Sequence, residues 1–322
     1  MSPAWRGIIK VGIVAPFSGP TPANGLALLQ GARLAADELN LNGGVGGYRV
    51  ELLVVDEEND RSFDDVLSDP NVMAAVGYLL PGVAPAAAAY QLAGLSWLIA
   101  EPTDLPELSM SPGAGPYRLV ASAAVVREVV VQYLTAQLGV SPEDATTFTA
   151  SCADTSRRRG QTIELGQGTL VCDDRPEDLV TALDTLPLQS RVICIDSCDT
   201  PDLGWWSGRL RLAYTTPLAT PGQGSQRWRQ LSARAAIDHP SPYVALGYDG
   251  VQIVAAAVGT ASRSGHLDRA SVKQALGSTD LSGVLGHYGS HGVDVATSEV
   301  REGFPGTVLG SVEATTIPVA RP

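Results

Sequence analysis

Lysine is nearly absent from this chain, which has two lysines among its 22 basic residues. Acidic residues outnumber basic ones, and the net charge of -12 argues against nucleic acid or an anionic membrane surface as a partner. Only 17% of the residues are charged and 44% are hydrophobic, so the composition is not that of a disordered chain and can supply packed cores. The length of 322 residues is typical of two domains.

Long hydrophobic runs are also missing. No apolar run reaches the roughly 18 to 20 residues that a membrane-spanning helix needs, so we expect no direct membrane insertion. The residues before the first predicted strand, Met1–Gly7, contain no apolar segment of the kind found in secretory signals. Two alternatives follow for localisation. Either an export segment has been removed and the protein is extracytoplasmic, at the cell surface or in the periplasm, or Met1 is the true start and the protein is cytoplasmic.

The short motifs of common catalytic sites are absent as well. The sequence has no GKS or GKT phosphate loop, no HExxH zinc motif and no GxSxG nucleophile elbow. The glycine-rich stretch Gly43–Gly47 follows a predicted helix and precedes a predicted strand, the reverse of the order in a dinucleotide-binding turn, so we interpret it as a helix stop. A surface turn is a better interpretation of His287–His291 than a metal site, because Gly289 disfavours a shared helical face. We therefore expect no cofactor and no enzyme activity.

The stretch from Ile8 to Asp60 is the most informative part of the sequence. Ile8–Ala15 and Tyr48–Val55 are short apolar runs rich in branched residues, as in buried strands. Between them Asn24 is the expected N-cap of a helix whose apolar face includes Leu28, Ala32, Ala35 and Leu39. Glycines 43 and 44 end that helix, and an acidic turn, 56–60, follows the second strand. This order predicts a βαβ unit in a parallel sheet covered by helices.

Several segments occur in the order of a known family. They are Pro16–Pro20, Gly31–Asn40, Gly43–Gly47, Val76–Tyr78, Leu98–Pro102, Pro106–Leu108, Tyr243–Val251 and Leu281–Gly286. In these residues the chain resembles the branched-chain amino-acid-binding (Leu/Ile/Val-binding) family, the type I periplasmic solute-binding proteins of ABC transporters. The resemblance covers most of the chain, and its first fifty-odd residues are the most specific. It implies capture of a small-molecule ligand between two hinged lobes, with ABC transporter membrane subunits as partners; the alternative is a cytoplasmic ligand sensor of the same fold acting on a partner protein.

The rest of the chain repeats the strand and helix rhythm. We predict strands at 72–77, 95–100 and 117–121, short helices over 62–69 and from Asp268 to Gly277, and longer helices over 123–138 and 243–258. A second run of strands is predicted at 146–152, 168–172, 191–195 and 209–216. The predicted fold class is α/β, with two Rossmann-like lobes joined by a multi-crossover hinge. Lobe one comprises 1–121 plus about 243–298, and lobe two comprises 122–242 plus about 299–322.

The candidate ligand-binding residues follow the predicted strand ends, because ligands of open parallel sheets lie outside the carboxyl ends of the strands. In lobe one they are Phe17, Ser18, Tyr78, Leu80, Gly82, Ala100, Glu101 and Thr103. In lobe two and near the hinge they are Asp154, Thr155, Ser197, Cys198, Thr216 and Tyr243. For each aromatic residue the alternative is that its ring packs under a loop, and we favour that alternative for Tyr248.

The predicted pocket is poorly suited to a free amino acid. A zwitterion needs hydroxyl and backbone N–H donors around its carboxylate. The loop Leu79–Pro85 has no hydroxyl, and its two prolines donate no N–H. Glu101 would repel a ligand carboxylate, although Ser18 and Thr103 offer partial compensation and Glu101 pointing to solvent is an equal alternative. If Glu101 faces the pocket, we expect a neutral or cationic ligand with an apolar part.

All four cysteines fall in predicted lobe two, at positions 152, 172, 194 and 198. Their spacing contains no CxxC, which argues against zinc, and Cys194 alternates within a strand as a core residue does. If one disulfide forms, Cys152 and Cys198 are the expected pair, because both are predicted to follow neighbouring strand ends. Free thiols are the alternative.

Overall fold

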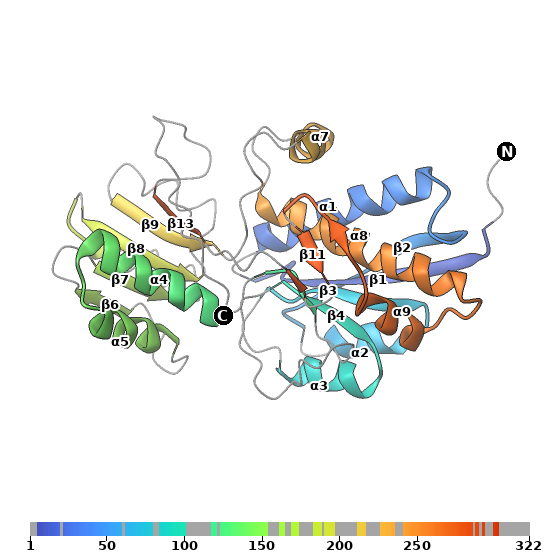
Figure 1. Ribbon diagram of the computed structural model, residues 1–322, viewed down its shortest axis with the longest axis horizontal. Helices are drawn as coiled ribbons and strands as arrows, with labels where there is room; N and C mark the ends of the chain where they lie inside the picture. Colours follow the sequence, from blue (N-terminus) through green and yellow to red (C-terminus); the bar gives the residue numbers. More distant parts are fainter. Residues whose placement is uncertain are drawn as a thin grey trace. The chain divides into compact units, whose positions relative to one another are not determined.

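The chain folds into two compact units in the computed structural model (Figure 1). Unit 1 comprises Met1–Val120 and Thr220–Val295, and unit 2 comprises Ala121–Ala219 and Ala296–Pro322. The described residues are 5–19, 22–59, 62–79, 84–100, 117–120, 123–153, 161–164, 169–173, 183–188, 190–196, 211–216, 226–235, 241–285, 287–289, 292–293 and 299–302.

Unit 1 is built on a five-stranded sheet in the order β2-β1-β3-β4-β5, in which every strand pair is parallel. The strands are β1 (Gly7–Ala15), β2 (Tyr48–Asp56), β3 (Val72–Gly77), β4 (Ser96–Ile99) and β5 (Tyr117–Arg118). All residues of β3 and β4 are buried, in keeping with sequences that are apolar apart from Ser96. The predicted βαβ unit and the later strands of lobe one are confirmed.

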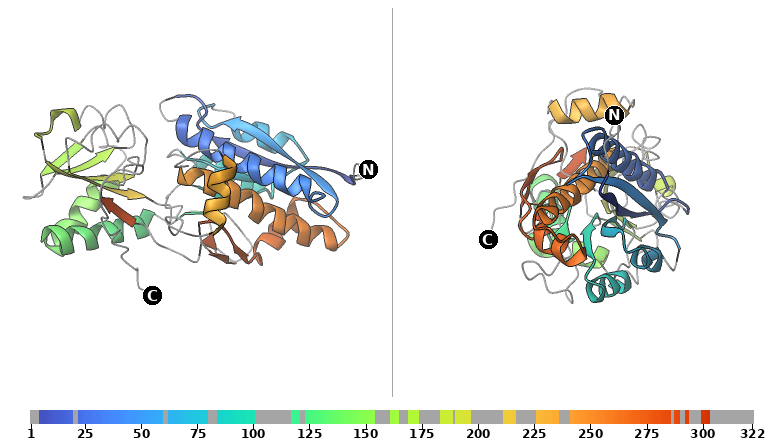
Figure 2. Two further views of the ribbon diagram at one scale, coloured as in Figure 1. Left: turned by 90° about the horizontal axis from the view of Figure 1, so that it is seen from above. Right: turned by 90° about the vertical axis from the view of Figure 1, so that its right-hand side faces the viewer.

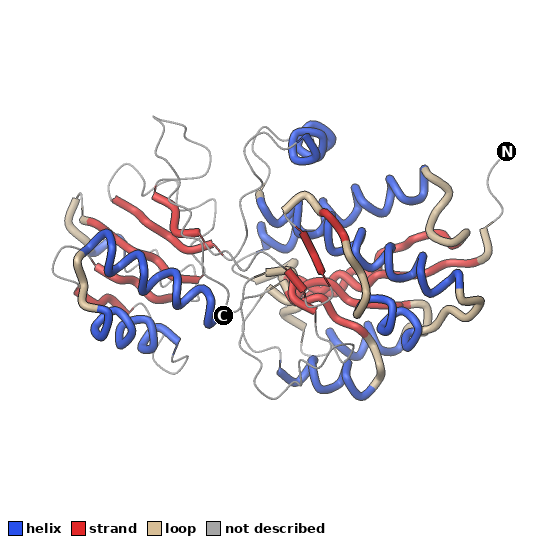
Figure 3. Tube along the Cα trace, viewed as in Figure 1, coloured by secondary structure: helices blue, strands red, loops and turns tan. Residues whose placement is uncertain are grey.

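Helices cover both faces of this sheet (Figures 2 and 3). On one face lie α1 (Pro22–Leu41), α8 (Pro242–Arg263) and α9 (Arg269–Leu276), and on the other lie α2 (Ser62–Ser68) and α3 (Ala84–Leu92). Beside α1 lies α7 (Gln226–Ala235). A small antiparallel sheet of β10 (Leu281–Ser282), β11 (His287–Gly289) and β12 (Gly292–Val293) completes the described part of the unit.

The ends of two helices test the capping predictions. Asn24 is not the N-cap of α1, because the helix begins at Pro22, and proline is favoured in the first helical turn. The helix ends at Leu41, and Gly43 and Gly44 follow with φ of +92° and +76°, as the glycine stop predicted. Asp268 does cap α9, with Ser271 completing a reciprocal capping box.

Two further expectations need correction in unit 1. Residues 287–289 form strand β11 rather than a surface turn, and Tyr288 within it is 3% exposed. Its ring therefore belongs to the core. By length and composition, Tyr243–Arg263 of α8 could also span a membrane, contrary to the expectation that no segment could. However, 72% of its most apolar window is buried within the protein, as in a core helix.

The helices α1 and α8 cross at unusually close range. A Cβ added at Gly31 would lie 1.7 Å from the carbonyl oxygen of Val244, and one added at Gly247 would lie 1.9 Å from that of Leu28. Each helix therefore contributes a glycine at the point where the other's backbone approaches. The crossing buries Leu28 and Val244 to 0% and 1% exposure, and it fixes α8 against the helix that follows β1.

Unit 2 differs more from its prediction. The segment 146–152 is not a strand, because it lies in helix α5 (Pro142–Ala153), which follows α4 (Ala123–Leu138). The hydroxyl of Ser141 accepts the N–H of Asp144 at 3.1 Å, so the helix start is capped. Thr146, Thr147 and Thr149 then donate their hydroxyls to carbonyls four residues earlier, at 2.7, 2.9 and 3.0 Å. The cap outweighs the strand preference of the threonines.

The sheet of unit 2 has the order β13-β9-β8-β7-β6. Its central strands β7 (Thr169–Asp173), β8 (Arg191–Asp196) and β9 (Arg211–Thr216) are parallel, as predicted. The edge strands β6 (Gln161–Glu164) and β13 (Glu299–Glu302) run antiparallel to their neighbours, which the expectation of a parallel sheet did not include. Cys152 lies on α5 and not after a strand. The cysteine side chains fall outside the described part of the structure, so the disulfide expectation stays a prediction.

Gly31→Ala should destabilise the protein, because its methyl group has no room against the backbone of α8. Overpacking of this kind costs about 1–3 kcal/mol, and we expect a loss of about 2 kcal/mol in the free energy of unfolding, measured by urea denaturation. Gly259→Ala is the matched control on α8. Its Cβ would meet Val45 at an ordinary 3.5 Å, so the better helix propensity of alanine should raise stability by up to about 1 kcal/mol. Equal effects of the two changes would contradict this account of the crossing.

Candidate functional site

The candidate site is the carboxyl edge of the unit 1 sheet, where the loops after its strands begin together. Parallel register places Ala15 opposite Asp56, Val14 opposite Gly77 and Gly77 opposite Ile99. The chain segments that leave β1, β2, β3 and β4 therefore start side by side. This is the edge at which the sequence predicted a ligand site.

Four predicted site residues of unit 1 are described at this edge. Phe17 is half-buried and Ser18 is exposed in the loop after β1, whereas Tyr78 and Ala100 are buried, with 3% and 2% exposure. The N–H of Ala100 donates to the carbonyl oxygen of Gly77 at 3.0 Å, which continues the pairing of β3 and β4 beyond the strand end. The structure thus brings together the start of each predicted loop.

Of the remaining predicted site residues, two are described and eight are not. Tyr243 is half-buried in the first turn of α8, and Thr216 is the last residue of β9, paired with Glu299 in unit 2. Eight others lie outside the described residues: Leu80, Gly82, Glu101, Thr103, Asp154, Thr155, Ser197 and Cys198.

Asp56, the last residue of β2, organises the loop after β1. Its carboxylate accepts the backbone N–H of Phe17 at 2.9 Å and that of Glu58 at 3.3 Å. Burial acts to raise the pKa of Asp56, but hydrogen bonds from the Ser18 hydroxyl and from these N–H groups outweigh it, so the pKa lies below its usual range. The charged carboxylate therefore ties the first two loops of the edge together.

Glu57 does the same for the loop after β3. Its carboxylate accepts the backbone N–H of Leu79 at 2.8 Å, while its own N–H donates to the carbonyl oxygen of Ala15 at 2.9 Å. The acidic turn after β2 thus holds both the loop after β1 and the loop after β3. Gly19 approaches the same turn, where a Cβ would lie 2.6 Å from Oε1 of Glu58.

Tyr78 contributes its backbone to the edge and its side chain to the core. Its ring packs edge-on against Trp97 and Tyr90, with centroids 4.8 and 6.0 Å apart, and its hydroxyl lies 2.8 Å from that of Tyr90. Its backbone has φ of +61°, the left-handed region, and its N–H donates to the carbonyl oxygen of Val14 at 2.7 Å. The burial of the Tyr78 ring agrees with the alternative given above, that an aromatic side chain packs under a loop. The strained backbone of Tyr78 turns the chain sharply at the edge.

Sequence reasoning missed the role of Asp56 and Glu57 as positioning residues. The signal was present, since two carboxylates directly follow a buried strand, where their side chains reach neighbouring loops. Tyr248, for which we favoured packing, is half-buried on α8, and its hydroxyl donates to Glu38 at 2.9 Å. It lies on the helical face and not at this edge.

Comparison with known proteins agrees with this architecture. Residues 8–142 match the family model described as periplasmic binding protein. A Leu/Ile/Val-binding protein, BraC3 of Rhizobium johnstonii, is 32% identical over 88 residues, which are 26% of this chain and 24% of that protein. The chain thus matches about a quarter of the length of this curated relative.

Solved structures match over nearly the whole chain. One is the branched-chain amino acid transporter substrate binding protein LivJ from Streptococcus pneumoniae in complex with isoleucine, with a TM-score of 0.72 and 19% sequence identity. The match covers 94% of this chain and 98% of the LivJ chain. A fatty acid ABC transporter substrate-binding protein from Thermomonospora curvata has a TM-score of 0.71 at 16% sequence identity, and the match covers 98% of this chain and 94% of that protein's chain. These findings confirm the resemblance drawn from the sequence: the chain has the type I periplasmic-binding-protein fold and is similar to the branched-chain amino-acid-binding proteins of ABC transporters.

Proposed function

We propose that this protein is the solute-binding component of an ABC importer and that it works outside the cytoplasm. A small molecule binds at the carboxyl edge of the unit 1 sheet, and unit 2 closes on it about the hinge. The chemistry is binding, so no residue acts as a catalyst. The proposed partners are the small-molecule ligand and the membrane subunits of the transporter.

One observation carries this proposal: the loops after three neighbouring strands are tied together at one edge by carboxylate to backbone bonds. Asp56 holds Phe17, and Glu57 holds Leu79, next to the left-handed backbone of Tyr78. Strain and fixed loops at the end of parallel strands are typical of binding sites, because they pre-organise the groups that contact a ligand. The similarity to substrate-binding proteins supports the same conclusion.

The charge of the edge supports a neutral or cationic ligand. The described residues 15–19, 56–59, 77–79 and 100 include three carboxylates, those of Asp56, Glu57 and Glu58, and no lysine or arginine. A ligand carboxylate would meet negative potential there without a compensating cation among these residues. A ligand with an apolar part and without a free carboxylate is therefore the better fit.

Ligand closure is tested by small-angle X-ray scattering. With a ligand shown to bind, the radius of gyration should decrease, because hinge closure brings two lobes together around the solute. The ligand is first identified by native mass spectrometry of the purified protein. Superimposable scattering curves with and without a bound ligand would count against the closing mechanism.

The ligand class is tested by calorimetry with leucine, isoleucine and valine, their amides, and small amines. We expect the amides to bind at least about tenfold more tightly than the free amino acids, because the amide removes the ligand carboxylate, and a tenfold ratio corresponds to only about 1.4 kcal/mol. Glu101→Gln should weaken binding of the cationic ligands selectively. Micromolar binding of leucine that Glu101→Gln leaves unchanged would overturn this assignment.

The carboxylate of Asp56 predicts a dependence of stability on pH. Because its pKa is lowered in the folded state, its contribution is complete above the usual aspartate pKa of about 4 and is lost as the pH falls through the lower folded value. Asp56→Asn should therefore lower the urea midpoint at neutral pH, and the difference from wild type should shrink below about pH 4. Asp37→Asn, on the exposed side of α1, is the control. A difference that is constant down to acid pH would contradict the role of the charge.

A further inference from the structure

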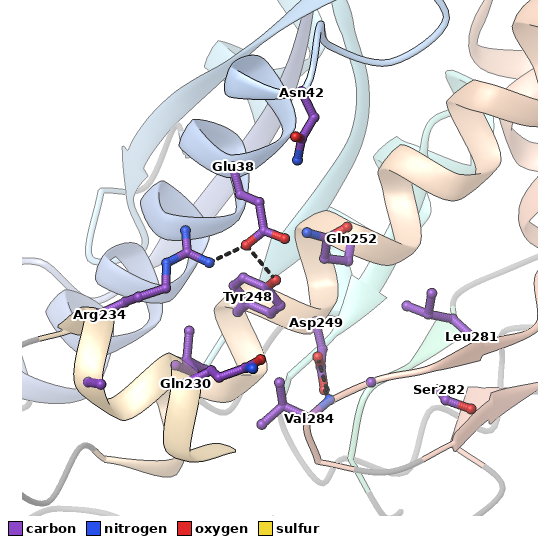
Figure 4. Close-up of a pocket in the computed structure, with 13 residues that line it drawn as sticks. Glu38, Asn42, Gln230, Arg234, Tyr248, Asp249, Gln252, Leu281, Ser282 and Val284 are labelled. Carbon is purple, nitrogen blue, oxygen red and sulfur yellow. Dashed lines mark hydrogen bonds and ion pairs between the residues drawn. The ribbon is translucent and has the colours of Figure 1, made fainter. Parts of the chain in front are cut away.

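A cavity of about 740 Å³ lies in unit 1 among α1, α7, α8 and the segment that follows β10 (Figure 4). Among the residues that the structure describes, none that lines it belongs to the loops that follow β1 to β4. It is therefore separate from the edge at which the transported solute is proposed to bind. Cavities of about 300–1,000 Å³ are typical of small-molecule sites, and this one has room for a molecule larger than a single amino acid.

Two charged groups of the cavity wall pair with each other. Glu38 on α1 forms an ion pair with Arg234 on α7 and accepts the hydroxyl of Tyr248 at 2.9 Å (Figure 4). The pKa of Glu38 is lowered by these bonds against the opposing effect of burial, so the pair stays charged. A second hydrogen bond, from Arg234 to the carbonyl oxygen of Leu34 at 3.3 Å, also links α7 to α1.

Asp249, the other carboxylate in the wall, is likewise fully engaged. It is 1% exposed and accepts the N–H groups of Val284 and Leu285 at 2.8 and 2.9 Å and the hydroxyl of Tyr288 at 3.1 Å. Gly283 permits this approach, since a Cβ there would lie 2.4 Å from Oδ2 of Asp249. The carboxylate thereby holds the segment after β10 in place, and the hydrogen bonds that its oxygens accept come from neutral donors of the protein.

The wall also carries three carboxamides and the hydroxyl of Ser282, and one of the carboxamides, that of Gln252, hydrogen-bonds Tyr248. Asn42, Gln230 and Gln252 come from the end of α1, from α7 and from α8, and all three line the cavity (Figure 4). A carboxamide both donates and accepts hydrogen bonds, so it pairs with ligand groups that do the same, such as hydroxyls and amides. Leu231, Leu281 and Val284 add apolar surface to the same wall.

We propose that this cavity is a second ligand site, for a neutral molecule that carries several hydroxyl or amide groups on a partly apolar frame. The carboxamides hydrogen-bond the ligand, and the ion pair between Glu38 and Arg234 already occupies these two charged groups. Since α7 is held to α1 through Arg234, the ligand also ties α7 to the helices of unit 1.

Calorimetry with two probes tests the proposal: maltose for hydroxyls, and N-acetyl-dialanine amide for amides. We expect at least one to bind at millimolar concentration or better. Gln252→Leu and Gln230→Ala should each weaken it by about tenfold, since each removes hydrogen bonds to the ligand. Gln132→Leu, which changes a glutamine on α4 of unit 2, and Phe17→Ala, at the strand edge, should leave it unchanged.

Each other outcome has a defined meaning. Binding of neither probe overturns the second site, as does binding that both glutamine variants leave unchanged. Binding that Phe17→Ala abolishes assigns the probe to the strand edge and also overturns it. Charged counterparts, maltobionate and unblocked dialanine, should bind more weakly, and equal affinity would contradict the preference for neutral ligands. Failure of this site does not affect the proposed solute site, which is tested with different ligands and variants.

Discussion

The structure of unit 1 depends on the close contact between α1 and α8. These helices are separated by about 200 residues of chain, a span that includes the whole first segment of unit 2. Their backbones approach where Gly31 and Gly247 leave space, and no other residue type fits there without moving a carbonyl group. The contact brings the returning chain onto the face of the sheet that α1 already covers. Both polar regions of the unit, the strand edge and the cavity beside α7, are built around helices that it positions.

Carboxylates have a structural role in both regions. Asp56 and Glu57 hold loops at the strand edge through backbone N–H groups, and Asp249 holds the segment after β10 in the same way. Each carboxylate satisfies donors that would otherwise be unpaired where the chain leaves regular structure. Part of the acidity of this protein is therefore internal scaffolding rather than a charged surface. This explains how a site for an uncharged ligand can coexist with several acidic residues.

The two polar regions of unit 1 differ in what they offer a ligand. The strand edge presents loops that begin side by side, with backbone strain at Tyr78 and three carboxylates close by. The cavity beside α7 presents three carboxamides and the ion pair between Glu38 and Arg234. The two ligands that we propose for unit 1 would therefore be recognised by different chemistry.

The sequence by itself determined the elements whose signals are local. Continuous apolar runs marked β1 to β4, paired glycines ended α1, and Asp268 capped α9, because each depends on a few neighbouring residues. Where two local signals competed, as in the threonine-rich segment of α5 that the cap at Ser141 turned into a helix, the pattern alone gave the wrong element. Only the tertiary structure decided that the ring of Tyr78 joins the core, that Asp56 and Glu57 hold the loops, and that Glu38 meets Arg234 and Tyr248. These outcomes depend on strand register and helix crossing, which bring together residues that are distant in the sequence.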